Sequence, residues 1–474
     1  MDLRGQLIHQ RHDRKIAVDV SSLVRWMGPP VGISRTEHAL ARAVLESHDG
    51  TLCLWDQQCG CFKGLNSKFI PVLIGWRGKI DTFRFDLALS PPRRGIRRLV
   101  PSARHPLIIG LERIRLTTKS DFVARIADRL QRIILGSYRR SIPLDDDQGR
   151  LTIVPYDLAV GDDLTLGPRD TVLLAGADWY GKDPGAIREL KARSGFRLAV
   201  ICYDLIPLLY PEFFMDADVQ LLRRYWTQMM TIADLFIFTS RRAESDARRL
   251  ASKFGLRLNE SAVAPLGFDP PPPPSINALP EGLAAGRYAL FVSTVEPRKG
   301  HALLLAVWRK LLARNVPQKR NFRLVFVGRP GWLVDDLIRE IGTASDDGSV
   351  MWLRNLADRE LDGLYRNAAF CLYPSLYEGF GLPILEGFAR GKAVIASTGG
   401  SLPEVVGDLS PCLDPTDEAA WEQMLAEWIE KPSSYARYEA LIKTEFSHVS
   451  WAQAAAQIIK LAAGAETMTG AGAD

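Results

Sequence analysis

Short apolar runs alternate with helix-like segments along the second half of the sequence, and this alternation narrows the choice of fold more than any other feature. Each run is typical of a buried strand and is followed by residues with helical spacing. The expected strands are Tyr288–Thr294, Arg323–Val327, Val350–Leu353, Ala369–Tyr373 and Ala393–Ser397; the expected helices are Ala302–Leu312, Trp332–Ile341, Asp358–Arg366 and Leu382–Arg390. Such alternation predicts an α/β fold with a parallel sheet between helices.

The first half shows the same alternation, with a disturbance in the middle. The expected strands are Ile16–Ser21, Thr171–Gly176, Leu198–Tyr203 and Leu235–Ser240, with a helix over Arg35–Glu46. Five consecutive prolines, Pro270–Pro274, cannot lie inside a helix or a central strand. Since 474 residues exceed one ordinary domain, we predict two Rossmann-like domains, 1–267 and 268–464, and a disordered tail, 465–474.

Positive charge is concentrated in the first half of the chain. Residues 1–265 carry 40 Lys and Arg against 30 Asp and Glu, whereas residues 266–474 carry 20 against 25. Residues 82–140, which we interpret as an insertion, hold 14 basic and 4 acidic residues. Within Asp121–Leu135, apolar residues recur at helical spacing with arginines between them. This pattern predicts a helix that lies on an anionic membrane, or a core helix with a solvated arginine face.

Several classes of protein are excluded by composition. The sequence contains no run of about 18 apolar residues, so we expect no membrane-spanning helix. The N-terminus lacks the apolar core of a secretion signal, so we expect no such signal. Six cysteines are too few to staple a chain of this length, so we expect reduced thiols in a cytoplasmic protein. Cys53, Cys59 and Cys61 lie close together but lack a fourth zinc ligand at a recognisable spacing.

The strongest candidate for a site is the segment from Tyr373 to Glu386. An apolar strand leads into Glu378, then into a loop with Gly379 and Gly381, then into a helix. Glycines let the backbone approach a ligand, and a helix N-terminus presents free N–H groups to an anion. Two carboxylates beside such a turn suit a ligand with many hydroxyls and an anionic group, such as a sugar bearing a phosphate.

This segment closely resembles the Glu-x7-Glu motif of retaining glycosyltransferases of family 4, which have the two-domain GT-B fold. In this sequence the motif is Glu378-x7-Glu386 with Gly-Phe-Gly-Leu-Pro inside it. A second element is similar: the loop Ser293–Gly300 follows the first strand of the C-terminal domain, as the diphosphate-binding loop of that family does. The resemblance is dense over residues 285–415.

The resemblance implies a role for each matching residue. Glu386 would bind the ribose hydroxyls of the donor, and Glu378 would hold the transferred sugar. Arg298 and Lys299 would hold the diphosphate, because two adjacent cations neutralise it before and during its departure. The other residues expected to bind the donor are Gly379, Phe380, Gly381, Leu382, Gly32 and Gly328.

Asp204 is expected to contact the acceptor. It lies in Cys202-Tyr203-Asp204-Leu-Ile-Pro207, where many family members carry His-Asp, so Tyr203 here replaces the histidine. A local alternative is that Asp204 satisfies the turn before Pro207.

Together these features predict a cytoplasmic retaining glycosyltransferase, peripheral on the inner face of the plasma membrane. It would move a hexose, first mannose from GDP-mannose, to a lipid-linked saccharide in exopolysaccharide or O-antigen synthesis. We expect no cofactor, no metal and no nucleic-acid partner. The alternatives are a UDP-sugar-dependent glycosyltransferase, a GT-B epimerase or phosphorylase, and a non-catalytic basic adaptor for membrane or nucleic acid.

Overall fold

A computed structural model describes residues 15–26, 31–47, 50–70, 159–270, 279–346 and 350–464, with isolated positions 73, 80–81, 123, 126, 152–153 and 348. The described residues fall into two compact units. The first lies within residues 1–182 and 189–196, and the second within residues 183–188 and 197–474. The domain boundary predicted near Gly267 stays a prediction.

The first sheet has eight strands, in the order β10-β9-β8-β7-β1-β2-β3-β6. Their bounds are β1 (Ile16–Asp19), β2 (Gly50–Asp56), β3 (Cys61–Leu65), β6 (Val160–Asp163), β7 (Thr171–Leu174), β8 (Arg197–Cys202), β9 (Leu235–Phe238) and β10 (Glu260–Val263). Strand β1 pairs in parallel with β2 and β7, so that Val18 lies opposite both Leu52 and Leu173. Strand β3 runs antiparallel to β2 and β6. Two short strands, β4 (Ile80–Asp81) and β5 (Thr152–Ile153), pair separately.

Helical elements follow several strands of this sheet. They are α1 (Ser21–Val24), α2 (Gly32–Ser47), η1 (Ser67–Phe69), η4 (Asp178–Tyr180), α7 (Pro184–Ser194), α8 (Ile206–Leu209), η5 (Pro211–Phe213), α9 (Asp216–Ile232) and α10 (Arg241–Lys253). Helix α10 begins where the sequence supplies a good N-cap, because Ser240 Oγ accepts a hydrogen bond from the amide of Ala243.

The second sheet has six parallel strands, in the order β13-β12-β11-β14-β15-β16. They are β11 (Tyr288–Val292), β12 (Arg323–Val327), β13 (Val350–Leu353), β14 (Phe370–Tyr373), β15 (Val394–Ser397) and β16 (Cys412–Leu413). The predicted α/β class is therefore confirmed. The order turns back between β11 and β14, and ligands of open α/β sheets bind at such a reversal, outside the carboxyl ends of the strands.

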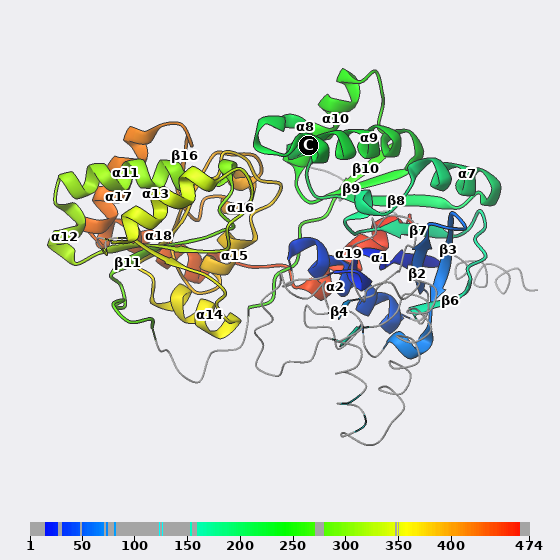
Figure 1. Cartoon of the computed structure of the whole chain (residues 1–474), viewed down its shortest axis with the longest axis horizontal. Helices are drawn as coiled ribbons and strands as arrows, with labels where there is room; N and C mark the ends of the chain where they lie inside the picture. The colour runs from blue at the N-terminus through cyan, green and yellow to red at the C-terminus, as the bar shows by residue number, and fades with distance from the viewer. Residues whose placement is uncertain are drawn as a thin grey trace, which may run out of the picture. The chain divides into compact units, whose positions relative to one another are not determined.

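Helices cover both faces of the second sheet, with α11 and α13 on one face and α14 on the other (Figure 1). The helical elements here are η6 (Pro297–Lys299), α11 (His301–Ala313), α12 (Val316–Arg320), α13 (Asp335–Asp346), α14 (Asp358–Asn367), α15 (Leu382–Phe388), α16 (Leu402–Val406), α17 (Glu418–Glu430) and α18 (Ser433–Glu445). The last helix, α19 (Trp451–Ala462), contacts β9 of the first sheet instead. Large side chains fill the space beneath them, including Trp308, Trp421 and Trp428, which are almost fully buried.

One predicted helix begins later than expected. The prediction placed its start at Trp332, but α13 begins at Asp335. The reason is local, because Leu333 has a positive φ of 56° that no α-helix contains.

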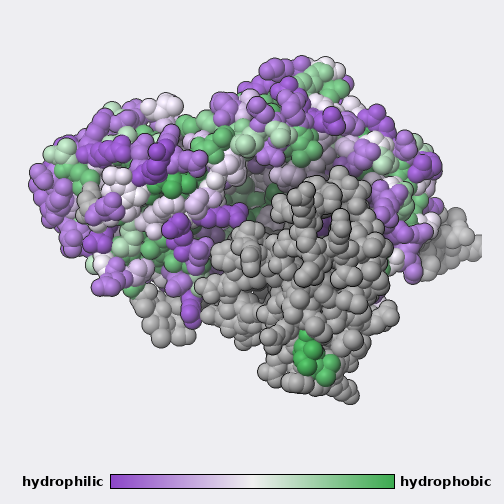
Figure 2. All heavy atoms as spheres, viewed as in Figure 1, coloured by the Kyte–Doolittle hydropathy of each residue, from purple (hydrophilic) through white to green (hydrophobic). Residues whose placement is uncertain are grey.

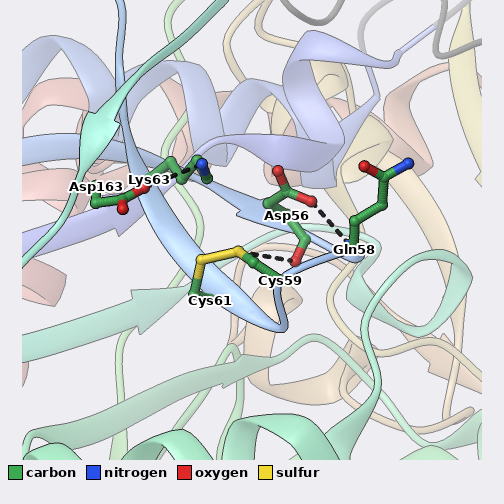
Figure 3. Close-up of a disulfide and its surroundings, with 6 residues drawn as sticks. All are labelled: Asp56, Gln58, Cys59, Cys61, Lys63 and Asp163. Carbon is green, nitrogen blue, oxygen red and sulfur yellow. Dashed lines mark hydrogen bonds and ion pairs between the residues drawn. A yellow bond between two sulfur atoms is a disulfide. The ribbon is translucent and has the colours of Figure 1, made fainter.

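Cys59 and Cys61 form a disulfide across the turn between β2 and β3 (Figure 3). The expectation of reduced thiols is therefore wrong for this pair. The turn brings their Cα atoms to 5.3 Å, within the usual range for a disulfide. The other four cysteines, Cys53, Cys202, Cys371 and Cys412, are free.

The membrane-binding helix predicted for residues 121–135 lies outside the described residues, except for Val123 and Ile126, which are helical and exposed. Within the described part of the chain, none of the helices combines the length and the apolar character needed to cross a membrane. On the face drawn in Figure 2, hydrophilic side chains of the described residues are mixed with small apolar areas.

Candidate functional site

Two loops meet where β11 and β14 end. These strands are parallel neighbours, so their carboxyl ends lie at the same edge of the second sheet. Strand β11 leads into η6, which carries Arg298 and Lys299, and β14 leads into the loop that carries Glu378. A backbone hydrogen bond of 2.7 Å, from the amide of Leu376 to the carbonyl of Arg298, ties the two loops together. The adjacent residues Arg298 and Lys299 thus meet Glu378, which follows them by 80 and 79 positions in the sequence.

Glu378 bridges the two cations. One carboxylate oxygen lies 2.9 Å from Arg298 Nη1, and the other lies 2.6 Å from Lys299 Nζ. The Arg298 Nη1 group also donates to the carbonyl of Tyr377 at 2.8 Å. A second carboxylate, that of Glu296, lies 3.1 Å from Arg298 Nη2. The side chains of this cluster, which we call the Glu378 cluster (Glu296, Arg298, Lys299, Glu378), are all about nine-tenths buried.

The charges of this cluster are fixed by its members. Burial alone would raise the pKa of Glu378, but Arg298 and Lys299 outweigh it and lower the pKa to about 2. For Arg298, burial lowers the pKa, whereas Glu378 and Glu296 raise it above its ordinary value. Glu378 is therefore an anion, and Arg298 a cation, throughout the physiological range. Glu378 cannot supply a proton there as a general acid.

One donor of the Glu378 cluster is left for a ligand. The Nε–H of Arg298 is buried and has no hydrogen-bond partner among the described residues. A buried donor without a partner is costly, and an anionic oxygen would satisfy it. The geometry therefore fits a phosphate group better than a neutral ligand.

Serines hold the loop after Glu378 in place. Ser401, the residue before α16, directs its hydroxyl at the carbonyls of Glu378 and Phe380, at 3.0 and 2.9 Å. Ser240, the N-cap of α10, donates to the carbonyl of Gly379 at 3.0 Å. These contacts fix the backbone between β14 and Leu382, the first residue of α15.

Gly379 and Gly328 are both required by close backbone approaches. A Cβ on Gly379 would lie 2.5 Å from the carbonyl oxygen of Tyr203 and 2.7 Å from Asp204 Cβ. A Cβ on Gly328 would lie 2.0 Å from the carbonyl oxygen of Ser293. The structure thus gives Gly328 a packing role at the ends of β11 and β12. Gly381 is the residue before α15 and has a φ of 124°.

Glu386 is the fifth residue of α15 and so belongs to the second turn of this helix. Its Oε2 accepts a hydrogen bond of 2.9 Å from the hydroxyl of Tyr365. Arg390 stacks on the ring of Tyr365, with its guanidinium carbon 5.0 Å from the ring centre. These contacts orient the half-buried carboxylate of Glu386.

Asp204 follows β8 and belongs to the same compact unit as Glu378. Its Oδ1 accepts a hydrogen bond of 3.1 Å from the amide of Ile206, so it does satisfy the turn before Pro207. Burial raises the pKa of Asp204, and the charge of Arg298 opposes this shift. Asp204 is thus electrostatically coupled to the Glu378 cluster.

Gly32 belongs to the first compact unit, where it is the first residue of α2 and its carbonyl accepts a hydrogen bond from Thr36. The rest of its glycine-rich loop, Gly28–Pro30, lies outside the described residues. Within the described part of the chain, no three His, Cys, Asp or Glu side chains gather as metal ligands.

Sequence reasoning missed three residues of this site. Glu296 was visible in its motif, but its contact with Arg298 was not predicted. Ser401 follows Gly399 and Gly400 after a predicted strand, and this position was a usable signal. The sequence contains no signal for Ser240, because its partner Gly379 lies 139 residues away along the chain.

Comparison with solved structures identifies the fold. The chain superposes on sucrose-phosphate synthase from Thermosynechococcus elongatus with a TM-score of 0.55, at 16% identity, covering 94% of this chain and 98% of that one. It superposes similarly on Anabaena HepE in complex with UDP and glucose, with a TM-score of 0.54 at 16% identity, covering 95% and 99%. At this identity the likeness shows the fold, which is GT-B.

Sequence relatives narrow the resemblance. Residues 283–444 match the family model of glycosyl transferases group 1. The chain is 31% identical to O-antigen chain mannosyltransferase B of Escherichia coli over 225 residues, 47% of this chain and 58% of that protein. It is 26% identical to the serotype-specific mannosyltransferase WbdA of Escherichia coli over 280 residues, 55% of this chain and 32% of that one. The chain thus resembles bacterial mannosyltransferases, and it spans about a third to three fifths of the length of these relatives.

Proposed function

We propose that this protein is a retaining glycosyltransferase that moves mannose from GDP-mannose to a saccharide acceptor. The observation that carries the proposal is the Glu378 cluster, in which two cations lie at the meeting ends of β11 and β14. The unpartnered Nε–H of Arg298 supports a phosphate ligand. The likeness to O-antigen mannosyltransferases favours mannose as the sugar.

The two cations would exchange partners when the donor binds. In the structure, Glu378 occupies both Arg298 and Lys299. Diphosphate oxygens would take over these contacts, and the Glu378 carboxylate would then accept hydrogen bonds from hydroxyls of the mannose. Two protein cations beside the leaving diphosphate can stabilise its charge, so the proposed reaction requires no metal and no cofactor.

Transfer would proceed on one face of the sugar. The bond between C1 and the phosphate oxygen breaks, and a bond forms between C1 and the acceptor oxygen on the same face. The proton of the acceptor hydroxyl passes to the departing phosphate oxygen. A covalent intermediate on a carboxylate such as that of Glu378 is the less favoured route.

We further propose a lipid-linked saccharide as the acceptor and exopolysaccharide or O-antigen synthesis as the process. The enzyme would be cytoplasmic and peripheral on the inner face of the plasma membrane, with no nucleic-acid partner. The support is the basic composition of residues 82–140 together with the O-antigen relatives.

Nucleotide release from GDP- and UDP-sugars, with and without a bacterial lipid extract and in the presence of EDTA, tests this proposal. We expect lipid-dependent release of GDP from GDP-mannose. The Glu378→Ala variant should lose this activity, whereas Glu340→Ala should keep it, because Glu340 lies on α13 in an exposed ion pair with Arg309 of α11. Release of UDP instead would establish the UDP-sugar alternative. A wild-type protein that binds no nucleotide would favour the adaptor alternative.

A further inference from the structure

An aromatic pair of half-buried Trp179 and exposed Tyr180 follows β7 in the first compact unit. Trp179 and Tyr180 belong to η4, and their ring centres lie 5.8 Å apart. Tyr180 is 68% exposed, more than any other large apolar or aromatic side chain that the structure describes. Because β7 is the neighbour of β1 in a parallel pair, this loop lies at the carboxyl edge of the first sheet. Ligands of α/β sheets bind at that edge.

A buried ion cluster holds this loop, and we call it the Lys182 clamp (Asp19, Asp178, Lys182). Lys182 Nζ lies 2.6 Å from Asp19 Oδ2 and also pairs with Asp178. The three side chains are at most 3% exposed. Asp19 is the last residue of β1 and accepts a hydrogen bond of 2.6 Å from Ser21 Oγ. The clamp therefore ties the aromatic loop to the end of the strand beside it.

Lys182 is charged within this clamp. Burial lowers the pKa of Lys182, but Asp178 and Asp19 outweigh it and raise the pKa above its ordinary value. Removing charges from water costs several kcal/mol per ion, so a buried ion cluster is weak evidence for stability. Its evident effect here is geometric, since it fixes both ends of the loop that exposes Tyr180.

Polar groups lie against Gly181, the residue that follows the aromatic pair. Gln57, in the turn that contains the Cys59–Cys61 disulfide, donates through Nε2 to the carbonyl of Gly181 at 2.6 Å. A Cβ on Gly181 would lie 2.8 Å from Arg25 Nη1. An aromatic face beside amide and guanidinium groups suits a sugar ring, which has one apolar C–H face and a rim of hydroxyls. A lipid chain has no hydroxyl groups that could pair with the amide and guanidinium groups.

We propose that Tyr180, with Trp179 beside it, is a stacking platform for a ring of the acceptor saccharide, and that the Lys182 clamp positions this platform. This inference rests on the proposed transfer to a saccharide. Tyr180 would contact the acceptor directly, whereas Lys182 would act only by holding the loop.

Acceptor kinetics and direct binding test the platform. The full chain is assayed with GDP-mannose and α-mannotriose, and binding of α-mannotriose is followed by saturation-transfer NMR in the presence of GDP. In Tyr180→Ala we expect the KM for mannotriose to rise about tenfold, with the KM for GDP-mannose unchanged. Tyr180→Phe should behave as the wild type, because it keeps the ring. Met215→Ala is the matched control, since Met215 is 50% exposed at the start of α9.

Lys182 is tested as a positioning residue. Lys182→Met should raise the KM for mannotriose while GDP binding is retained, and Lys182→Arg should restore part of the affinity. If Lys182→Met fails to fold, Tyr180→Ala still decides the proposal. Equal mannotriose binding by wild type and Tyr180→Ala would overturn it.

Failure of the proposed mannosyl transfer would look different. In that case the wild type would release no GDP from GDP-mannose. Saturation transfer with α-mannotriose, maltotriose and chitotriose would then still test the platform. Binding of one of them that Tyr180→Ala loses would support it, and binding of none would overturn it.

Discussion

Glu378 Oε1 lies 2.6 Å from Lys299 Nζ, so a carboxylate of the protein is ion-paired with a cation that would bind the diphosphate of the proposed donor. Arg298 is occupied by the same carboxylate through Nη1. The donor diphosphate must therefore compete with Glu378 for both cations. Binding and transfer can respond differently to a change at this residue, and this difference makes the Glu378 cluster testable.

Glu378→Gln should separate the two responses. The amide removes the competing charge, so we expect GDP to bind as tightly as in the wild type or more tightly. Transfer should fall roughly 100-fold, the usual effect of losing one preorganised electrostatic contact. Calorimetric titration with GDP and the rate of GDP release measure the two quantities. Weaker GDP binding would contradict the exchange of partners.

The stability of the protein should depend on Glu378 in acid. Its pKa in the folded protein is about 2, against an ordinary value of 4.5. A lowered pKa stabilises the fold above pH 4.5, and this contribution is lost as the pH falls from 4.5 toward 2. The shift corresponds to on the order of 3 kcal/mol. The unfolding free energy of the wild type should thus decrease more steeply across this window than that of Glu378→Gln, measured by urea unfolding.

Two glycine substitutions should change the stability of the protein in opposite directions. Gly379→Ala places a Cβ against the carbonyl oxygen of Tyr203, so we expect the unfolding free energy to fall by about 1–3 kcal/mol. We also expect the rate of transfer to fall. Gly342→Ala is the matched control. Gly342 lies inside α13 with no heavy atom within 4 Å of the added Cβ, so we expect a gain of about 0.5–1 kcal/mol. Thermal unfolding of both variants checks the signs, and a neutral Gly379→Ala would argue against the close approach.

The disulfide predicts a specific thiol count. Under non-reducing conditions the unfolded protein should react with an alkylating reagent at four cysteines, Cys53, Cys202, Cys371 and Cys412. Mass spectrometry should show six additions only after reduction. Because the closed loop is short, Cys59→Ser with Cys61→Ser should cost only about 1.5 kcal/mol. Six additions without reduction would show that the pair is not joined.

Local patterns predicted most of the second sheet. Strands β12 and β13 have the bounds that the apolar runs suggested, and β11 ends two residues early, at Val292. Buried parallel strands read as continuous apolar runs, and this makes them visible in a single sequence. The meeting of Arg298, Lys299 and Glu378 was also predictable, because their motifs follow strands that belong to one sheet.

Contacts between distant segments were not predictable. The hydroxyl of Ser240 reaches the carbonyl of Gly379 only in the folded chain, and no local pattern marks that meeting. The left-handed backbone at Leu333 shortened a helix, although leucine is a good helix former. Tyr180 carries no motif, and only its exposure in the structure identifies it.

The pairing of β1 with β7 has a consequence for how the protein is made. The two strands lie roughly 150 residues apart in the sequence, whereas β2, the other neighbour of β1, follows soon after it. At a translation rate of about 5–20 residues per second, one edge of β1 waits about 8–30 s for its partner to leave the ribosome. An unpaired apolar strand edge is prone to aggregation. Expression at a lower temperature or with added chaperones should therefore raise the yield of soluble protein.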